Sequence, residues 1–239
     1  MNVAILLAGG TGSRMGDTKK PKQFLNLCGK PVIAHSLETF ENCKSIDKII
    51  LVCADEFKKE LLQIAKSYNI KKITGIANAG KTRSESSWNA LCFLMEILDE
   101  KQKDKCIVLI HDSARPLVSK KIIEENIECA KNNFACETVI HSVDTIIQSF
   151  DRKTAYKTLN RNELFLVQTP QSFTFNLIYS AYEKFFALSE NEKPNLTDDA
   201  SVVQFFNNTK VHFVYGDKKN TKLTTKEDFA VLEILSRLD

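Results

Sequence analysis

The chain opens with a short apolar stretch that runs into a glycine-rich segment, Leu7-Ala8-Gly9-Gly10-Thr11-Gly12-Ser13-Arg14-Met15-Gly16. Glycines that follow a strand leave backbone amides bare, and such amides can bind the oxygens of a phosphate chain. Cationic side chains stand beside this segment: Arg14 lies within it, and Lys19, Lys20 and Lys22 follow it. Several cations around one glycine-rich loop suit a polyanion such as a nucleoside triphosphate, whose transfer requires charge to be neutralised at phosphorus.

Two familiar phosphate-binding patterns do not match this loop. A dinucleotide-binding fold has G-x-G-x-x-G, whereas Gly10, Gly12 and Gly16 leave one residue too many. The P-loop with its Gly-Lys-Ser/Thr is absent as well. Asp55 ends a predicted strand and could face a ribose, so a nicotinamide-dependent dehydrogenase is an alternative that the glycine spacing and the cations disfavour. An alternative interpretation of the same cations is a cluster of solvated surface lysines without a role in binding.

Further motifs follow along nearly the whole chain in a fixed order. They are Pro21-Lys22-Gln23-Phe24, Gly80-x-x-Arg83-x-x-Ser86, His111-Asp112-x-x-Arg115-Pro116, Val143-Asp144-Thr145, Arg161-x-x-Leu164, Gln168-Thr169-Pro170-Gln171, Thr197-Asp198-Asp199-Ala200-Ser201 and Asn220-x-Lys222-x-Thr224. With these motifs and the glycine-rich opening, the chain resembles the 2-C-methyl-D-erythritol 4-phosphate cytidylyltransferases and the related ribitol 5-phosphate cytidylyltransferases. The resemblance implies CTP and a small polyol phosphate as substrates, with Mg2+ carried by CTP as the cofactor.

The reaction that the resemblance implies joins the acceptor to the α-phosphorus of CTP: an oxygen of the acceptor phosphate attacks in line, and magnesium pyrophosphate leaves. A phosphomonoester is already anionic near pH 7, so no general base is needed to create the nucleophile. Accordingly, nothing in the sequence resembles a Ser-His-Asp triad, and the four histidines are scattered. Catalysis then rests on positioning and on cations that stabilise the transition state. By the family pattern the catalytic residues are Arg14, Lys22, Arg161 and Lys222.

The same resemblance assigns nucleotide binding to two segments of the chain. The residues that it implies are Leu7, Ala8, Gly9, Gly10, Gly80, Lys81, Arg83 and Ser86. The segment that starts at Gly80 recognises cytosine in the family largely through backbone groups, which accounts for a small residue there. Lys81 departs from the family, which frequently has an acidic residue at this position. Taken alone, the segment also fits a plain turn from strand to helix, with Ser86 in the first helical turn.

The acceptor-binding residues that the resemblance implies lie in five separate motifs. They are Asp112, Thr145, Arg161, Thr197 and Lys222. Asp112 follows a predicted strand at the carboxyl edge of a parallel sheet, where a carboxylate can orient a polyol hydroxyl or help hold a magnesium shell. Four of these positions also have an interpretation without a role in binding. These are an ion pair from Asp112 to Arg115, a solvated arginine at position 161, a helix N-cap at Thr197 and a surface lysine at position 222.

Two acceptors compete, because the motifs divide between the branches of the family. Thr197-Asp198-Asp199-Ala200-Ser201 and Ser113-Ala114 resemble the methylerythritol branch, whereas Leu7-Ala8-Gly9-Gly10 and Arg161-Asn162-Glu163 resemble the ribitol branch. The first pair of motifs lies nearest the expected acceptor, so methylerythritol phosphate is preferred. A nucleotide-binding protein without catalysis is a further alternative, against which the joint presence of the four catalytic cations argues.

Short runs rich in β-branched residues alternate along the chain with segments of helical period. The predicted strands are residues 3–7, 48–53, 72–76, 106–110, 138–142 and 211–215. The predicted helices are residues 33–41, 56–68, 82–98, 120–132, 175–186 and 226–238. This alternation predicts an α/β, Rossmann-like fold, in which a mostly parallel sheet carries helices on both faces. The length of 239 residues suits one nucleotidyltransferase domain, residues 1–239.

Residues 143–166 interrupt this pattern. The segment is polar, contains the turn-like Phe150-Asp151-Arg152-Lys153 and alternates loosely on either side of it, which predicts a hairpin arm. The arm has little chain of its own to cover Ile147 and Tyr156, so we expect them to pack on a second subunit. In the family, the arm residues assigned to the acceptor reach it from the neighbouring subunit. We therefore expect a homodimer with shared active sites.

Charge and composition restrict the partners and the compartment. The 33 basic and 30 acidic residues leave a net charge of +3, too small for a general attraction to nucleic acid or to an anionic membrane. The seven cysteines form an odd set without a C-x-x-C pair, as in reduced proteins. We recognise no secretory signal and no apolar run of about 18 residues. We therefore expect a cytoplasmic protein without nucleic-acid or membrane partners.

Overall fold

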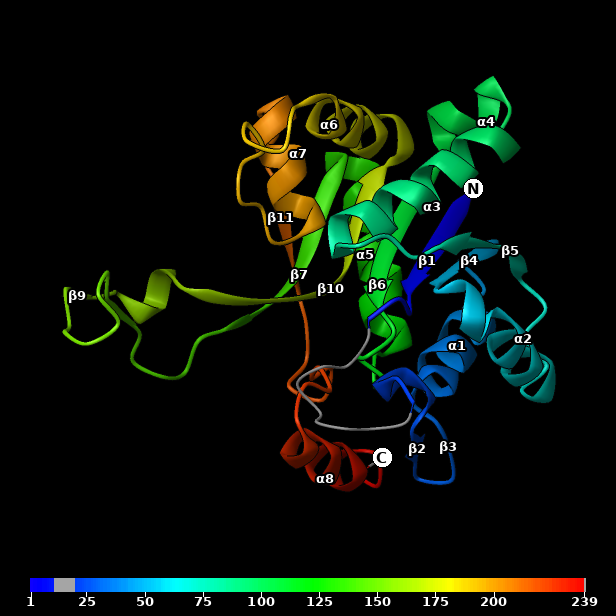
Figure 1. The fold of residues 1–239 in the computed structure, drawn as a ribbon, viewed down its shortest axis with the longest axis horizontal. Coiled ribbons are helices and arrows are strands. Elements are labelled where there is room, and N and C mark those ends of the chain that lie inside the picture. Colours follow the sequence, from blue (N-terminus) through cyan, green and yellow to red (C-terminus); the bar gives the residue numbers. More distant parts are fainter. Residues whose placement is uncertain (11–19, 239) are drawn as a thin grey trace.

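The computed structural model describes residues 1–10 and 20–238. Its centre is a seven-stranded sheet with the order β11-β7-β10-β6-β1-β4-β5 (Figure 1). The strands are β1 (Asn2–Leu7), β4 (Lys48–Cys53), β5 (Ile73–Asn78), β6 (Ile107–Asp112), β7 (Ala135–His141), β10 (Phe165–Thr174) and β11 (His212–Tyr215). Neighbouring strands pair in parallel except at β10, which is antiparallel to β6 and β7. The mostly parallel sheet predicted from the sequence is confirmed.

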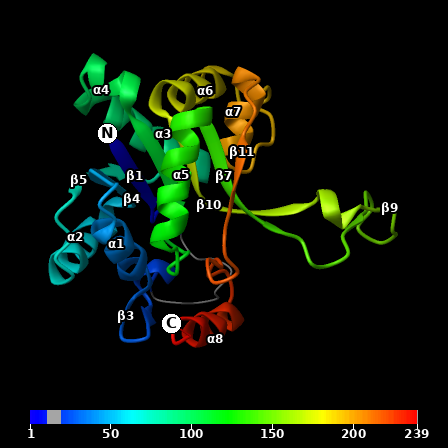
Figure 2. The same ribbon diagram turned by 180° about the vertical axis from the view of Figure 1, so that it is seen from behind.

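Helices cover both faces of the sheet. Successive side chains of a strand point to opposite faces, so an apolar strand contributes to a core on each face. Ile5 and Leu7 of β1 pack into a core with α3, α6 and α7, whereas Ala4 and Leu6 pack into a core with α1, α2 and α5. The helices are α1 (Val32–Asn42), α2 (Lys58–Ser67), α3 (Arg83–Ile97), α4 (Glu100–Lys105), α5 (Lys120–Asn133), α6 (Phe175–Ala187), α7 (Asp199–Asn207) and α8 (Lys226–Leu235). Figures 1 and 2 show the two sides. The predicted α/β layering is confirmed.

Strand β10 is the main element that the sequence patterns do not predict. Its central part, Gln168-Thr169-Pro170-Gln171-Ser172, is polar and contains a proline, a composition that argues against a central strand. The pairing with β7 shifts register between Val167 and Gln171, so the irregularity accommodates Pro170. The buried Gln171 accepts hydrogen bonds from the backbone N–H groups of Asp199 and Ala200, 3.0 and 3.1 Å away. The polar strand is therefore stabilised by partners distant in sequence.

A hairpin arm leaves the sheet between β7 and β10 and reaches away from the body in both views (Figures 1 and 2). It contains the short strands β8 (Ile147–Gln148) and β9 (Lys157–Thr158), which pair antiparallel, and the 3-10 helix η4 (Arg161–Glu163). Its side chains Val143, Ile147, Phe150 and Tyr156 are exposed. The predicted hairpin is thus present, and its role in dimerisation stays a prediction.

A third, smaller core joins the two ends of the chain. The hairpin of β2 (Asn26–Leu27) and β3 (Lys30–Pro31) contributes Leu27, the start of α1 contributes Val32, and the C-terminal segment contributes Leu223 and Leu232. Two short 3-10 helices, η2 (Lys22–Phe24) and η3 (Asp55–Phe57), follow β1 and β4 in the chain. The third core brings the segment after β11 next to the segment that carries Lys22.

Two chemical properties of the described chain bear on its environment. Each of the seven cysteines, all within the described residues, carries a free thiol. Of the helices in the described part of the chain, none combines the length and the apolar character that a membrane crossing needs.

Candidate active site

A cavity of about 470 Å3 opens where β1 and β6 end and α3 begins. This is the carboxyl edge of the parallel strands, where open α/β sheets bind ligands. The residues predicted from the sequence that line the cavity are Leu7, Gly9, Gly10, Lys22, Gly80, Lys81, Arg83, Ser86, Asp112 and Lys222. Gln23, Thr82, Ser113, Ala114 and Thr224 complete the lining. Segments from five places in the sequence therefore meet at one site.

The remaining predicted site residues that the structure describes do not line the cavity. Ala8 is buried and does not line the cavity. Thr145 and Arg161 are exposed on the hairpin arm, and Thr197 is exposed just before α7. Arg14, with the rest of residues 11–19, lies outside the described residues. Among the described residues, the cavity therefore brings together the predicted nucleotide-binding residues other than Ala8 with Lys22, Asp112 and Lys222.

The start of the glycine-rich loop is fixed by Gln23, a residue of the Pro21-Lys22-Gln23-Phe24 motif whose role the sequence does not indicate. The buried Gln23 amide Nε2 donates to the carbonyl oxygens of Ala8 and Gly10, 2.6 and 3.1 Å away. Gly9 allows a close approach, because an added Cβ would stand 2.5 Å from the Cβ of Ala79. Gln23 thus occupies the carbonyl groups of the loop and places its neighbour Lys22 at the cavity.

The segment before α3 forms a closed turn. The Ser86 hydroxyl accepts a hydrogen bond from the Gly80 N–H and donates one to the Thr82 carbonyl, each 3.0 Å long. The Glu85 carboxylate accepts from the Lys81 N–H at 2.7 Å, and a Cβ at Gly80 would stand 2.4 Å from the Cβ of Glu85. The strand-to-helix turn considered from the sequence is therefore present, and the same turn lines the cavity.

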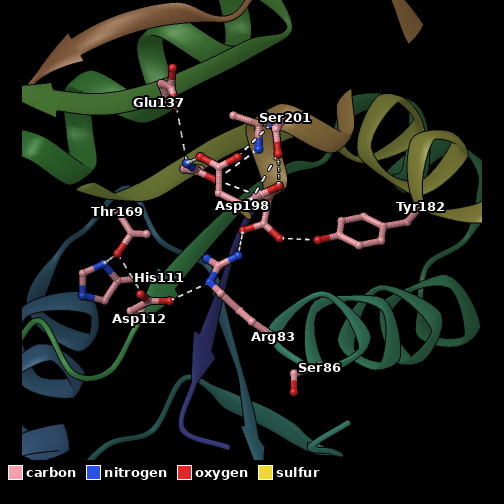
Figure 3. A network of polar contacts seen from close by, with 12 residues as sticks. Arg83, Ser86, His111, Asp112, Glu137, Thr169, Tyr182, Asp198 and Ser201 are labelled. Carbon is pink, nitrogen blue, oxygen red and sulfur yellow. Dashed lines mark hydrogen bonds and ion pairs between the residues drawn. The ribbon is translucent and has the colours of Figure 1, made fainter. Parts of the chain in front are cut away.

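A chain of alternating charges crosses the site (Figure 3). The two oxygens of Asp112 face two cations, Arg83 Nε at 3.1 Å and Lys222 Nζ at 2.5 Å. Arg83 also holds the buried Asp199, with Nη1 2.7 Å from Oδ2. The hydroxyl of Tyr182 donates to the other oxygen of Asp199 at 2.6 Å. This network reaches from the core between α6 and α7 to the cavity.

The charges set the protonation states of the network. Burial alone would raise the pKa of Asp112, but attraction to Arg83 and Lys222 outweighs it and holds this pKa far below the ordinary range. Burial acts to lower the pKa of Arg83, whereas Asp199 and Asp112 raise it above its ordinary value. Burial and Asp199 together raise the pKa of Tyr182. Asp112 is therefore a carboxylate and Arg83 a cation at neutral pH.

His111 shapes the loop that carries Asp112. The Arg115 carbonyl can only accept, so Nε2–H of His111 donates to it at 3.1 Å. In the neutral ring Nδ1 then accepts from the Thr169 hydroxyl, 3.0 Å away, and Thr169 Oγ1 accepts from the Asp112 N–H at 3.1 Å. Burial lowers the pKa of His111 to about 4, so the ring is neutral. Arg115 bonds to the carbonyls of Asn220 and Val167, partners different from the ion pair with Asp112 considered from the sequence.

Two of the three lysines that line the cavity, Lys22 and Lys222, lie against one segment. Lys22 Nζ donates to the carbonyl of Leu223 at 2.5 Å, and the neighbouring Lys222 lines the cavity beside Asp112. Ammonium groups from opposite ends of the chain therefore face the same space. They can neutralise a triphosphate and a second phosphate held close together.

The described residues that line this cavity do not form a magnesium site from protein side chains alone. Among the residues that the structure describes, no group of three or more His, Cys, Asp or Glu side chains could hold a metal ion. The carboxylate of Asp112 is already paired with two cations. A divalent ion would therefore be coordinated mainly by phosphate oxygens and water.

Comparison with known proteins identifies the family. Residues 2–237 match the family model described as 2-C-methyl-D-erythritol 4-phosphate cytidylyltransferase (IspD). A protein of that name from Clostridium kluyveri (strain NBRC 12016) is 40% identical over 97% of this chain and 95% of its own length. A ribitol-5-phosphate cytidylyltransferase from Streptococcus agalactiae serotype V (strain ATCC BAA-611 / 2603 V/R) is 30% identical over 98% of this chain and 95% of its own.

Solved structures agree with this comparison. The 4-diphosphocytidyl-2C-methyl-D-erythritol synthase from Anaerococcus prevotii DSM 20548 superposes with a TM-score of 0.83 at 31% identity, covering 99% of this chain and 96% of that one. The Francisella tularensis 2-C-methyl-D-erythritol 4-phosphate cytidylyltransferase gives 0.78 at 30% identity, covering 98% and 99%. The chain therefore belongs to the 2-C-methyl-D-erythritol 4-phosphate cytidylyltransferase family.

Proposed function

We propose that this protein transfers the cytidylyl group of CTP to the phosphate of 2-C-methyl-D-erythritol 4-phosphate. The products are 4-diphosphocytidyl-2-C-methyl-D-erythritol, a precursor in isoprenoid synthesis, and pyrophosphate. Membership of the family supports the reaction. The observation that carries the proposal is the meeting of Lys22 and Lys222 in one cavity that Gly9, Gly10 and Asp112 also line.

In the proposed complex, CTP lies with its base against the turn that begins at Gly80 and its triphosphate over Gly9 and Gly10. An oxygen of the acceptor phosphate forms a bond to the α-phosphorus, and the bond from that phosphorus to the bridging oxygen of pyrophosphate breaks. Lys22 and Arg14 neutralise the charge that the transition state gathers on the transferred phosphate. Lys222 holds the acceptor phosphate, and Asp112 orients a hydroxyl of the polyol. No proton needs to be removed from the nucleophile.

Magnesium is proposed to enter with the triphosphate. It would neutralise charge on the phosphate oxygens and on the departing pyrophosphate. Because the described residues give Asp112 two cationic partners, we assign no protein ligand to the ion.

A homodimer is proposed to complete the acceptor site. The arm that carries Thr145 and Arg161 reaches away from the body of the subunit (Figure 1). It exposes four apolar side chains that a second subunit would cover. In this arrangement, Thr145 and Arg161 of one subunit approach the acceptor phosphate bound by the other. The free thiols support a reducing compartment, and we propose the cytoplasm.

Ribitol 5-phosphate is the second candidate acceptor, favoured by the 30% identity to a ribitol-5-phosphate cytidylyltransferase. Phosphorus NMR of reactions with CTP, magnesium and either polyol phosphate tests the choice. The proposal predicts the paired signals of a diphosphate diester with methylerythritol phosphate, and at most a weak product with ribitol phosphate. The reverse preference would assign the ribitol reaction. No product with either acceptor, together with stabilisation by CTP, would leave a nucleotide-binding protein without catalysis.

A further inference from the structure

Lys222 stands on a segment that has no regular secondary structure of its own. We call residues 217–224, which connect β11 to α8, the Lys222 strap. Asn220 and Leu223 of the strap are fully buried, whereas Lys222 between them is partly exposed and lines the cavity. Because neither helix nor sheet bonds hold the strap, its side chains and neighbouring loops must fix the position of the ammonium group.

Asn220 fastens the strap to β10. Its Nδ2 donates two hydrogen bonds, to the Thr169 carbonyl at 2.8 Å and to Gln168 Oε1 at 3.1 Å. Gln168 Nε2 in turn donates a hydrogen bond to the carbonyl of Asp217 at 2.9 Å. One buried amide therefore joins the strap to the strand that also positions His111 through Thr169.

A second set of bonds joins the strap to the loop of Asp112. Arg115 Nη1 donates to the Asn220 carbonyl at 2.8 Å, and the Leu223 N–H donates to the Ala114 carbonyl at 2.8 Å. The strap residues that make these bonds, Asn220 and Leu223, flank Lys222. Their partners, Ala114 and Arg115, follow Asp112 in the same loop. The geometry of the ion pair between Lys222 and Asp112 is therefore set by its two flanking connections.

Asn220 differs from an asparagine that only fills the core. Both hydrogen bonds of its Nδ2 go to β10, whereas its buried Oδ1 has no hydrogen-bond partner among the described residues. The other fully buried asparagine, Asn126, has its Nδ2 bonded to Ile122 and Thr138 and its Oδ1 bonded to Ser172. Asn126 lies on α5, away from the cavity lining, and provides a matched control.

We infer that Asn220 is a positioning residue that places Lys222 for the acceptor phosphate. This inference rests on the proposed function. Leu223 has its own anchors, the bond to Ala114 and the third core, and Lys22 is tied to Leu223. Loss of the Asn220 amide should therefore displace Lys222 more than the nucleotide side of the cavity. A shift of this kind impairs alignment of the acceptor, for which small displacements are costly.

The test is a double-mutant cycle in the full-length protein between Asn220→Ala and Lys222→Ala, read as kcat/KM for methylerythritol phosphate. Asn220→Ala should lower this value by about 10- to 100-fold while changing the KM for CTP by about twofold or less. In the Lys222→Ala background, the same substitution should have little further effect, because the group that it positions is gone. Asn126→Ala should lower the thermal midpoint while leaving the KM for the acceptor near its original value.

Additive effects of Asn220→Ala and Lys222→Ala would overturn the inference, as would equal changes in the KM of both substrates. If Asn220→Ala does not fold, the cycle is repeated with Arg115→Lys, which shortens the reach to the Asn220 carbonyl and keeps the charge. Coupling to Lys222 again supports the inference and additivity again overturns it. An unmodified protein that forms no product would contradict the proposed function, whereas an active protein with an additive cycle contradicts only the role of Asn220.

Discussion

Arg83 Nη1 lies 2.7 Å from Oδ2 of Asp199, and the Asp199 side chain is completely excluded from solvent. The two residues are 116 positions apart, and the pair joins the N-terminus of α3 to the first turn of α7. On the other side of the guanidinium, Arg83 Nε reaches Asp112 at the cavity. The pair therefore connects the core on one face of the sheet to the carboxylate that holds Lys222.

Replacement of Asp199 by Asn should destabilise the protein. Arg83 would keep its charge but lose its buried partner, and removal of one partner from a buried pair costs about 3 kcal/mol. Urea unfolding measures this change in the free energy of unfolding. Tyr182→Phe, which removes one hydrogen bond to Asp199, should cost about 1 kcal/mol and is the matched comparison. Equal, small losses for both variants would contradict a structural role of the ion pair.

Glu137 should make stability depend on pH. Burial and the neighbouring Asp198 raise the pKa of Glu137 from 4.5 to about 7, so the folded state holds a proton that the unfolded state releases. The contribution is complete below about pH 4.5, is lost as the pH rises through about 7, and amounts to roughly 2–4 kcal/mol. Glu137→Gln should therefore gain stability relative to the unmodified protein between about pH 5 and about pH 8.

Comparison of Glu137→Gln with the unmodified protein isolates the contribution of Glu137 to the pH dependence of stability. His111, whose pKa is lowered from 6.5 to about 4, has the opposite effect: it favours the folded state above 6.5 and loses this contribution as the pH falls. Because His111 is common to both proteins, its effect cancels in the difference. A difference in the free energy of unfolding that stays constant with pH would refute the raised pKa of Glu137.

Lys22→Ala should lower kcat by about 100-fold or more while CTP still binds, because the ammonium acts chiefly on the charge of the transition state. Steady-state kinetics and calorimetric titration with CTP separate the two effects. Lys20→Ala is the matched control, since Lys20 lies two residues earlier and pairs with Glu60 at 2.7 Å. The control should retain nearly full activity. Comparable losses in both variants would remove the specific role of Lys22.

Hybrid dimers test whether active sites are shared. Arg161→Ala should chiefly impair use of the acceptor, and a mixture with Lys22→Ala subunits should recover part of the activity, because one of the two sites in a hybrid is intact. About a quarter of the activity is expected at full exchange of equal amounts. Light scattering should give the mass of a dimer. Failure of the mixture to recover activity, with exchange of subunits demonstrated, would rule out shared sites.

The parallel core was predictable from sequence because its signals are local. β1, β4 and β6 read as continuous apolar runs, which is the pattern of strands buried on both faces. β10 has no such signal, since its polar side chains become favourable only when α7 and His111 supply partners. Its direction in the sheet is likewise fixed by contacts with β6 and β7, which no local pattern encodes.

Several site residues were recognisable by type and motif, but not by their partners. The motifs identified Arg83, Asp112 and Lys222 one by one. Their connection to Asp199 and Tyr182 was not predictable, because a buried aspartate beside a helix N-cap and a tyrosine in an amphipathic helix have common structural explanations. Gln23 and Asn220 stood inside quoted motifs, yet their roles depend on hydrogen bonds to distant carbonyl groups.

If an acceptor phosphate displaces pyrophosphate from CTP in the cavity between Lys22 and Lys222, release of pyrophosphate must depend on the acceptor. The decisive measurement is the rate of pyrophosphate release from CTP and magnesium, with and without methylerythritol phosphate. We expect release only when the acceptor is present, with one diphosphate product formed for each pyrophosphate. Release at the same rate without the acceptor, or none with it, would exclude this displacement.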